Sequence, residues 1–235
     1  MVKRKTALKL RQAHRYLGLF IGIQFIMWTV SGMYFSWTDI DDIHGDQFKK
    51  LPPEQTSFND LISPSSISDV KEITSIELKE ISGKPYYFIN EVALFNARSG
   101  QKLSEISKED ALAIAKRNMK DDLKVGSVKR ITETGSHHEY RGGSLPAYVI
   151  LYDTPENLRA YISAKDGTFK SVRHRDWRWF DFLWMTHTMD YEGRDDFNTL
   201  VLRAFSLLGL ITVLSGFVLW YISSPTVRKM QKKLK

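Results

Sequence analysis

The sequence predicts a membrane protein of the α+β class, in which two transmembrane helices flank an extracytoplasmic domain of two helix-plus-antiparallel-sheet repeats. Two charge-free runs near the ends, two hairpin-like stretches between them and an uneven distribution of charge support this prediction. The 235 residues are 43% hydrophobic and 12% aromatic, which is too rich for a disordered chain. Cysteine is missing, which excludes a disulfide scaffold, a thiolate zinc site and a cysteine nucleophile.

The two charge-free runs are long enough to cross a bilayer. Residues 16–38 form a run of 23 and residues 204–227 a run of 24. A helix needs about 20 mainly apolar residues to span ~30 Å of hydrocarbon, a length that buried helices of soluble proteins rarely require. The mean hydropathy of −0.30 therefore averages two apolar spans with a polar middle.

The net charge of +7 is concentrated at the two ends of the chain. Residues 1–15 contain six basic residues and residues 228–235 contain five, and neither stretch has an acidic residue. The rest of the chain carries 23 basic and 27 acidic residues. The positive-inside rule then predicts a two-pass membrane protein with both termini cytoplasmic and residues 39–197 extracytoplasmic. The lipid bilayer is the expected counterpart of the basic tails, and nucleic acid is not an expected partner.

Two similar stretches predict antiparallel hairpins in the middle of the chain. Residues 84–89 (KPYYFI) align with residues 145–150 (LPAYVI), and each is followed by a second apolar stretch and a turn. Ser107 is a suitable N-cap for a helix that runs through about Met119, ahead of the second hairpin. Residues 66–72 are a weaker helix candidate ahead of the first hairpin.

An amphipathic helix is expected after the second repeat. At helical spacing, Trp177, Trp184 and His187 fall on one side, which suits a helix lying in the membrane interface. The predicted organisation is a basic tail, the first span, two repeats, an interfacial helix with its loop, the second span and a second basic tail, over residues 1–15, 16–38, 39–106, 107–175, 176–197, 198–224 and 225–235, respectively.

The histidines are the natural candidates for cofactor chemistry in a chain without cysteine. His137 and His138 are expected in a solvated loop with Glu139, with a weak metal site as the alternative. His174, between two arginines, is expected on the surface. His44 follows an acidic stretch at the mouth of the first span, where the acids either cap the membrane boundary or capture a cation.

His14 and His187 stand apart because each lies at the apolar boundary of a membrane element. Ionisable groups at membrane depth are costly and are therefore functional-site candidates. His14 lies one turn before Gly18 and two turns before Gly22, a smooth face that suits a porphyrin beside an imidazole ligand. The alternatives are a His14 placed at the lipid headgroups and a glycine face that packs against another helix.

The sequence resembles the PepSY-associated transmembrane proteins over nearly its whole length. The helix motifs RQAHRYLGL, VSGMYF and LSGFVLW carry this resemblance most specifically, at residues 11–19, 30–35 and 214–220. Residues 107–115 and 146–167 resemble PepSY domains. Larger relatives with four membrane helices are linked to reduction of iron and ferric siderophores through haem held by membrane histidines. Isolated PepSY domains occur in protease propeptides.

The resemblance implies a membrane-anchored, haem-binding electron-transfer subunit that passes electrons to an outer acceptor such as a ferric chelate. It places this subunit in the bacterial cytoplasmic (inner) membrane, with residues 39–197 in the periplasm. Haem b would be held by His14 and His187, with Gly18 and Gly22 beside the ring. On the outer side, His44 or a histidine of a neighbouring copy would pair with His187. Since this chain has only two spans, a second copy or another membrane redox subunit would complete the inner ligand set.

Arg203 is the candidate for holding a haem propionate, if the second helix starts at Asn198 and buries it. Pairing with an acidic neighbour or snorkelling to the surface is the alternative. No residue is assigned a role in proton transfer. No G-x-G-x-x-G, G-x-S-x-G or H-E-x-x-H occurs, so the sequence lacks nicotinamide, flavin and common hydrolase fingerprints.

A non-enzymatic role is the competing reading of the resemblance. In it, the PepSY repeats form a binding module that inhibits or regulates a periplasmic protease or helps to assemble an envelope complex. Whether the chain is part of a haem-dependent ferric reductase, and so of an enzyme, is left open by the sequence.

Overall fold

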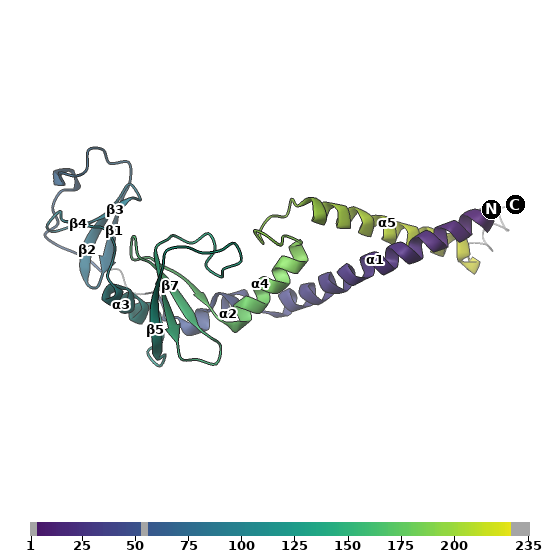
Figure 1. Cartoon of the computed structure of the whole chain (residues 1–235), viewed down its shortest axis with the longest axis horizontal. Coiled ribbons are helices and arrows are strands. Elements are labelled where there is room, and N and C mark those ends of the chain that lie inside the picture. Colours follow the sequence, from purple (N-terminus) through teal and green to yellow (C-terminus); the bar gives the residue numbers. More distant parts are fainter. Residues whose placement is uncertain (1–3, 53–55, 227–235) are drawn as a thin grey trace. The chain divides into compact units, whose positions relative to one another are not determined.

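The computed structural model describes residues 4–52 and 56–226, which form two compact units (Figure 1). The helical unit comprises the described residues up to 38 and those from 181 onwards. The sheet unit comprises the described residues between 39 and 180. The basic residues expected in the C-terminal tail, from Arg228 onwards, lie outside the described residues, as does Lys3 at the other end.

Two long antiparallel helices, α1 (Arg4–Trp37) and α5 (Leu200–Ser223), lie side by side in the helical unit (Figure 1). Phe20 stacks on Phe205 with 5.5 Å between ring centroids. The helix α1 begins well before the predicted span, because residues 4–15 contain no Gly or Pro and are rich in Lys, Arg, Leu and Ala, which favour helices. The basic N-terminal stretch is therefore largely a helical extension of the span.

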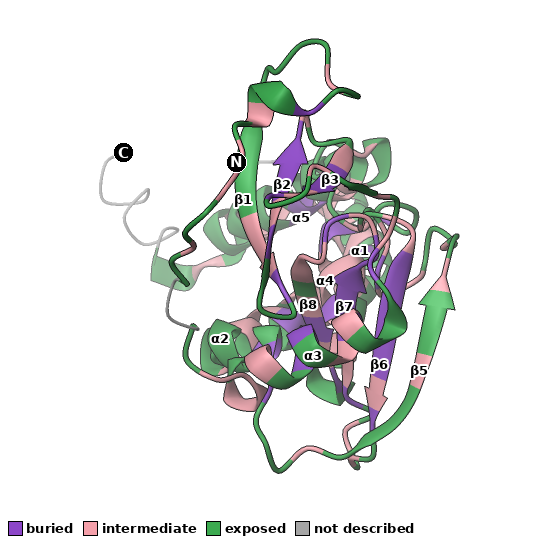
Figure 2. Cartoon of the chain, turned by 90° about the vertical axis from the view of Figure 1, so that its left-hand side faces the viewer, coloured by how far each residue is buried: buried purple, intermediate pink, exposed green. Residues whose placement is uncertain are grey.

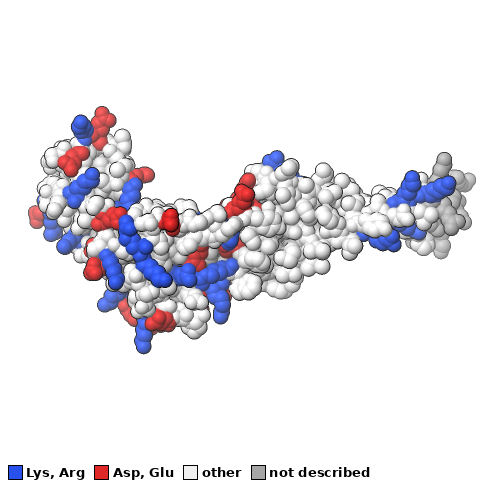
Figure 3. All heavy atoms as spheres, viewed as in Figure 1, with Lys and Arg blue, Asp and Glu red and all other residues white. Residues whose placement is uncertain are grey.

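Both long helices have the length and composition to cross a membrane. In the most apolar window of each helix, only 11% of the residues are buried inside the protein, whereas the core helix of a soluble protein would be mostly buried. The space-filling view shows that the helical unit has long stretches of surface without charged side chains (Figure 3). A bilayer is the environment that such a surface requires.

The sheet unit contains two antiparallel four-stranded sheets, each with its strands in chain order. This confirms both predicted hairpins and the α+β class. The strands of the first sheet are β1 (Ile76–Ile81), β2 (Lys84–Ile89), β3 (Ala93–Asn96) and β4 (Lys102–Leu103). Those of the second are β5 (Val125–Ile131), β6 (Ala147–Tyr152), β7 (Arg159–Ser163) and β8 (Phe169–Arg173). Figure 2 shows β6 and β7 largely buried and the edge strand β5 exposed.

One helix, α3 (Lys108–Asn118), contributes to the core of both sheets. It begins where predicted, because the Ser107 hydroxyl accepts the Asp110 N–H at 3.0 Å and the Asp110 carboxylate accepts the Ser107 N–H at 3.1 Å. Its buried residues pack with Ile81 and Phe88 of the first sheet and with Ile150 and other residues of the second.

The helix expected over residues 66–72 does not form, and this prediction was wrong. The chain makes a single 3-10 turn, η2 (Pro64–Ser66), and continues without regular structure to β1. The β-branched residues Ile67, Val70 and Ile73 lower the helix propensity of this stretch. The two repeats thus share a sheet plan and differ in their helices.

A short helix, α2 (Ile40–His44), opens the sheet unit and is followed by the turn η1 (Asp46–Phe48). Asp39 caps α2 by accepting the Asp41 N–H at 2.9 Å. Gly45 ends α2 with a φ of +79°, and a Cβ there would lie 2.8 Å from Val172, so only glycine fits.

His174 is 1% exposed, so its predicted surface position was wrong. Its Nε2 lies 3.0 Å from the carbonyl oxygen of Asp42 and 3.2 Å from that of Ile43. The ring also packs edge-on against Phe48. Flanking arginines suggested exposure, but the imidazole is buried because its N–H donates to backbone carbonyl oxygens, of which that of Asp42 also accepts the Gly45 N–H.

Candidate functional site

His187 lies near the end of α4 (Arg175–Thr188) and contacts the long helix α1 within the helical unit. Its Nδ1 lies 2.7 Å from the Ser31 hydroxyl oxygen, and its ring meets Phe35 edge-on at 5.6 Å. Burial lowers the pKa of His187, which favours the neutral imidazole. The apolar surroundings expected for this histidine are therefore present.

Two further side chains of α1 fix the end of α4. The Gln24 amide donates to the carbonyl oxygen of Thr186 at 3.2 Å, and the Trp28 indole N–H donates to that of His187 at 2.8 Å. Gln24, Trp28 and Ser31 recur at intervals of four and three residues, so they share one face of α1. These residues satisfy carbonyls that the end of any helix leaves without a partner.

His14 lies at the other end of the helix pair. Its Nδ1 is 2.7 Å from the hydroxyl oxygen of Ser215 on α5. The neighbouring Gly216 makes room for the ring, since a Cβ at this position would lie 3.3 Å from His14 Cε1. His14 therefore packs against α5, and its place beside a porphyrin or at the lipid headgroups stays a prediction.

His14 and His187 belong to separate sites. Ser31, the partner of His187, follows His14 by seventeen residues on one continuous helix, which corresponds to ~25 Å along its axis. One metal ion therefore does not bind to both histidines. The other four histidines of the chain lie in the sheet unit.

The donor set at each site fits a haem ligand. In each histidine one ring nitrogen, Nδ1, is held by a serine, and no described residue hydrogen-bonds Nε2. Metal-bound histidines characteristically use one nitrogen for the metal and engage the other in a hydrogen bond that fixes the ring. Nε2 of each ring is therefore the nitrogen that would bind a haem iron if one were held there.

The glycine face of α1 is open among the residues that the structure describes. There, a Cβ at Gly18 or at Gly22 would meet no atom within 4 Å. The glycine that allows close helix packing is Gly209 of α5, where a Cβ would lie 3.1 Å from the Phe25 ring. Pairing of α1 with α5 therefore does not account for Gly18 and Gly22, and their place beside a cofactor stays a prediction.

Arg203 and His44 are both exposed, whereas the sequence predicted a buried Arg203 if the second helix started at Asn198. The helix α5 starts at Leu200 instead of Asn198, so Arg203 lies exposed in its first turn and donates to the Asn198 side chain at 3.3 Å. His44 is the exposed last residue of α2, in the sheet unit. The described residues contain no cluster of three or more His, Cys, Asp or Glu side chains suited to a metal ion.

The loop with His137 and His138 is less solvated than expected. His137 is exposed, but the Glu139 side chain is only 10% exposed, in a cluster of hydrogen-bond donors. Burial alone would raise the pKa of Glu139, but hydrogen bonds from Arg178 and Tyr161 hold it below the usual value. The solvated-loop prediction is therefore wrong for Glu139, because its neighbours supply the donors that water would otherwise provide.

The sequence alone does not indicate that Ser31 and Ser215 are partners of the two histidines. The available signal was that each is a polar residue within an apolar span, where side chains face a partner more often than lipid. Gln24 carries the same signal. Which histidine each serine meets depends on contacts across 156 and 201 residues of chain.

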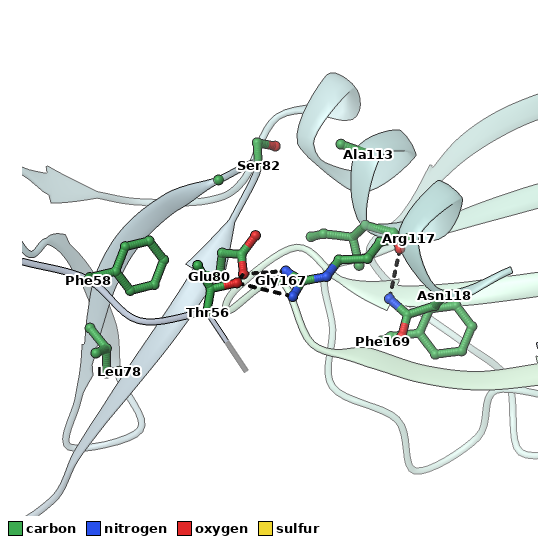
Figure 4. A pocket seen from close by; sticks show the side chains of 12 residues that line it. Thr56, Phe58, Leu78, Glu80, Ser82, Ala113, Arg117, Asn118, Gly167 and Phe169 are labelled. Atoms are coloured by element: carbon green, nitrogen blue, oxygen red, sulfur yellow. Dashed lines mark hydrogen bonds and ion pairs between the residues drawn. The ribbon is translucent and has the colours of Figure 1, made fainter. Parts of the chain in front are cut away.

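The sheet unit has a groove of about 710 Å³ beside the edge strand β1 (Figure 4). Phe58 and Leu78 lie on one side, and Arg117 of α3 forms an ion pair with Glu80 across it. The groove therefore offers apolar surface and a charged pair next to β1, which has no second partner strand in the described part of the chain.

Comparison with known proteins agrees with the arrangement of helices and sheets. The family model described as the PepSY-associated TM region matches residues 2–223, which is nearly the whole chain. Searches of curated proteins and of solved structures returned no match. The chain belongs to the family of the PepSY-associated TM region.

Proposed function

We propose that this protein is a membrane-anchored, haem-binding electron-transfer subunit that supports reduction of ferric iron or a ferric siderophore outside the cytoplasmic membrane. The observation that carries the proposal is how the ring nitrogens of His14 and His187 are hydrogen-bonded. Each presents Nε2 without a described hydrogen-bond partner, while a serine engages Nδ1. Two such imidazoles at opposite ends of a helix pair suit two haem sites, one near each face of the bilayer.

A bound haem b would supply one-electron redox chemistry at each site. The role of His14 and His187 is to bind the iron, and the role of their serine partners is to hold the rings. Gly18 and Gly22 leave room on α1 for a flat ring near His14. Arg203 is exposed at the start of α5, where its guanidinium is available to a propionate.

The second axial ligand of the His14 site is proposed to come from a second copy of the chain or from another membrane redox subunit. Within the helical unit, His14 and His187 are too far apart to share an iron. A homodimer would bring two His14 side chains to one two-fold axis. For the outer site, His44 and a histidine of a neighbouring copy are the candidates.

The proposed topology places both termini in the cytoplasm and residues 39–197 in the periplasm. The basic residues that flank the two spans support it. A reporter active only in the periplasm, fused after Gly167, would be active under this topology. Activity of a cytoplasm-only reporter at the same position would reject it.

Haem binding is tested on full-length protein purified in detergent from cells supplied with haem. The expected result is a Soret band whose intensity per protein falls in His14→Ala and in His187→Ala, and disappears in the double variant. His137→Ala, a substitution in the exposed loop, is the matched control and should leave the band unchanged. No Soret band in the wild-type protein, or a full band in the double variant, would reject the proposal.

Reduction of an outer acceptor is a separate measurement. The haem-loaded, reduced protein is mixed with a ferric siderophore, and its reoxidation is followed by the loss of the reduced spectrum. A rate above that of free haem supports a reductase role. A rate equal to that of free haem would reject a specific reductase role toward this acceptor.

The groove of the sheet unit favours a second candidate function, the binding of an extended peptide of a periplasmic protein such as a protease. An unpaired edge strand can add a peptide strand by main-chain hydrogen bonds, and the adjoining apolar surface can take its side chains. A peptide library selected on the full-length protein would then lose binding in Leu78→Asp. Equal selection by the wild type and this variant would reject a role for the groove.

A further inference from the structure

The two candidate ligand histidines have the same pattern of local hydrogen bonds. Ser31 of α1 and Ser215 of α5 each have a hydroxyl oxygen 2.7 Å from a carbonyl oxygen of their own helix, that of Met27 and that of Thr212, respectively. The same hydroxyl oxygens lie 2.7 Å from Nδ1 of His187 and of His14. The two serines that form this pattern lie on different helices and at opposite ends of the helix pair.

These contacts determine which atom carries each proton. A serine hydroxyl has one hydrogen, and a carbonyl oxygen only accepts. At 2.7 Å the Ser31 hydroxyl must therefore donate to Met27, since two oxygens at that distance without a hydrogen between them would repel each other. Its lone pairs then face His187, so the Nδ1–H of His187 must be the donor.

The same reasoning applies at the other site. The Ser215 hydroxyl donates to the Thr212 carbonyl, so it accepts from the Nδ1–H of His14. A neutral imidazole carries one N–H, and with that hydrogen on Nδ1 the lone pair resides on Nε2. Both histidines would thus present the same ring nitrogen as a metal ligand.

We infer that Ser31 and Ser215 are positioning residues that hold His187 and His14 in the Nδ1–H form and so prepare Nε2 to bind a haem iron. The haem part of this inference rests on the proposed function, whereas the tautomer part does not. Without a partner, the Nε2–H form of a neutral histidine is the more populated one. Each serine therefore selects the form that a free side chain would disfavour.

The helices contain matched controls for this inference. The hydroxyls of Ser36 and Ser223 donate to carbonyl oxygens of their own helices, at 2.9 Å from Met33 and 2.6 Å from Leu219. Neither serine contacts a histidine among the described residues. Substituting them removes the same kind of intrahelical hydrogen bond and leaves both rings in place.

The tautomer is measured in the haem-free, full-length protein in detergent at a pH where the histidines are neutral, by long-range proton–nitrogen NMR of ¹⁵N-labelled histidine. We expect Nδ1–H signals for both rings in the wild type. Ser215→Ala should lower the ratio of Nδ1–H to Nε2–H at His14 by about fivefold or more, the factor expected for loss of one hydrogen bond. Ser31→Ala should do the same at His187 only.

The controls and the conservative variant decide the outcome. Ser36→Ala and Ser223→Ala should leave both ratios unchanged, and Ser215→Thr, which keeps a hydroxyl, should restore the His14 ratio. Predominant Nε2–H in the wild type, or an unchanged ratio in both alanine variants, would overturn the inference.

Haem titration of the same proteins separates this inference from the proposed function. Ser215→Ala should weaken haem binding at the His14 site by about 10- to 100-fold, a typical effect of removing an outer-shell partner. Tautomers that shift as expected in a protein that binds no haem would uphold the role of the serines and reject the haem function. Haem binding together with tautomer ratios that do not change in the serine variants would support the haem function and reject the role of the serines.

Discussion

Nε2 of His174 lies 3.0 Å from the carbonyl oxygen of Asp42. This contact joins the start of the sheet unit, where Asp42 lies, to the residue that precedes α4. Because a carbonyl oxygen only accepts, Nε2 must carry the hydrogen and donate it. The chain thus enters and leaves the sheet unit at two segments held together by one buried imidazole.

His174→Ala is expected to destabilise the protein by about 2–4 kcal/mol. It removes the side-chain donor of the Ile43 carbonyl oxygen and creates a cavity beside Phe48, whereas the Asp42 carbonyl keeps the Gly45 N–H. The measurement is denaturant unfolding of the full-length protein in detergent. His137→Ala, at an exposed position, should change the free energy of unfolding by no more than about 0.5 kcal/mol, and equal effects of the two substitutions would contradict the assigned role.

Asp166 is expected to make stability depend on acid pH. Its burial would raise the pKa, but hydrogen bonds from Lys79 and Thr168 lower it to about 2 from an ordinary value of 3.8. Because the folded-state pKa is below the unfolded one, the carboxylate stabilises the fold above about pH 4 and loses this effect as the pH falls towards 2.

The test is Asp166→Asn in the full-length protein. At pH 7 the variant should be less stable than the wild type by about 2 kcal/mol, and the difference should shrink as the pH approaches 2. Asp69→Asn, at an exposed position, is the control and should show no such convergence. A difference that stays constant from pH 7 to pH 2.5 would show that Asp166 is not the group responsible.

Packing of the two long helices should depend on Gly209. A Cβ there would lie 3.1 Å from the Phe25 ring, so Gly209→Leu forces α1 and α5 apart and should cost about 1–3 kcal/mol. A Cβ at Gly32 meets nothing within 4 Å, so Gly32→Ala should be neutral or slightly stabilising. Thermal unfolding in detergent compares the two, and a larger loss in Gly32→Ala would refute the packing described here.

Glu139 is expected to be the most sensitive acidic residue of the second repeat. It binds Arg178 at 2.6 Å and Arg159 at 2.9 Å, and it accepts the Tyr161 hydroxyl at 2.6 Å. Glu139→Ala leaves two partly buried guanidinium groups without their anion and should cost about 3 kcal/mol. Denaturant unfolding would show a loss of at most about 0.5 kcal/mol for the exposed Glu133→Ala, and comparable losses would argue against the cluster.

The sequence was sufficient for features that depend on local chemistry. Charge-free runs located both spans, and paired apolar stretches with turns located the central strands of both sheets. Ser107 and Asp110 located the start of α3, because a capping box is complete within four residues. The edge strands β1 and β5 were not predicted, since exposed Lys, Glu and Arg side chains interrupt their apolar pattern.

The candidate site was only partly predictable because its contacts join distant segments. Boundary position singled out His14 and His187, but nothing local indicated that each would meet a serine on another helix. The same limit applies to His174 and Glu139, whose polar neighbours in sequence suggested solvent. In both cases the tertiary fold supplies partners that allow a polar side chain to be buried.

The helix α3 has a consequence for how the two sheets can be separated. Its first turn binds the β1–β2 turn through Ser82 and Asp110, at 2.6 Å, and its buried face packs with residues of both sheets. A fragment containing either repeat alone would expose half of a common core. We therefore expect the tandem repeats to unfold as one cooperative unit, so that a molecule that docks on either sheet protects the other from unfolding as well.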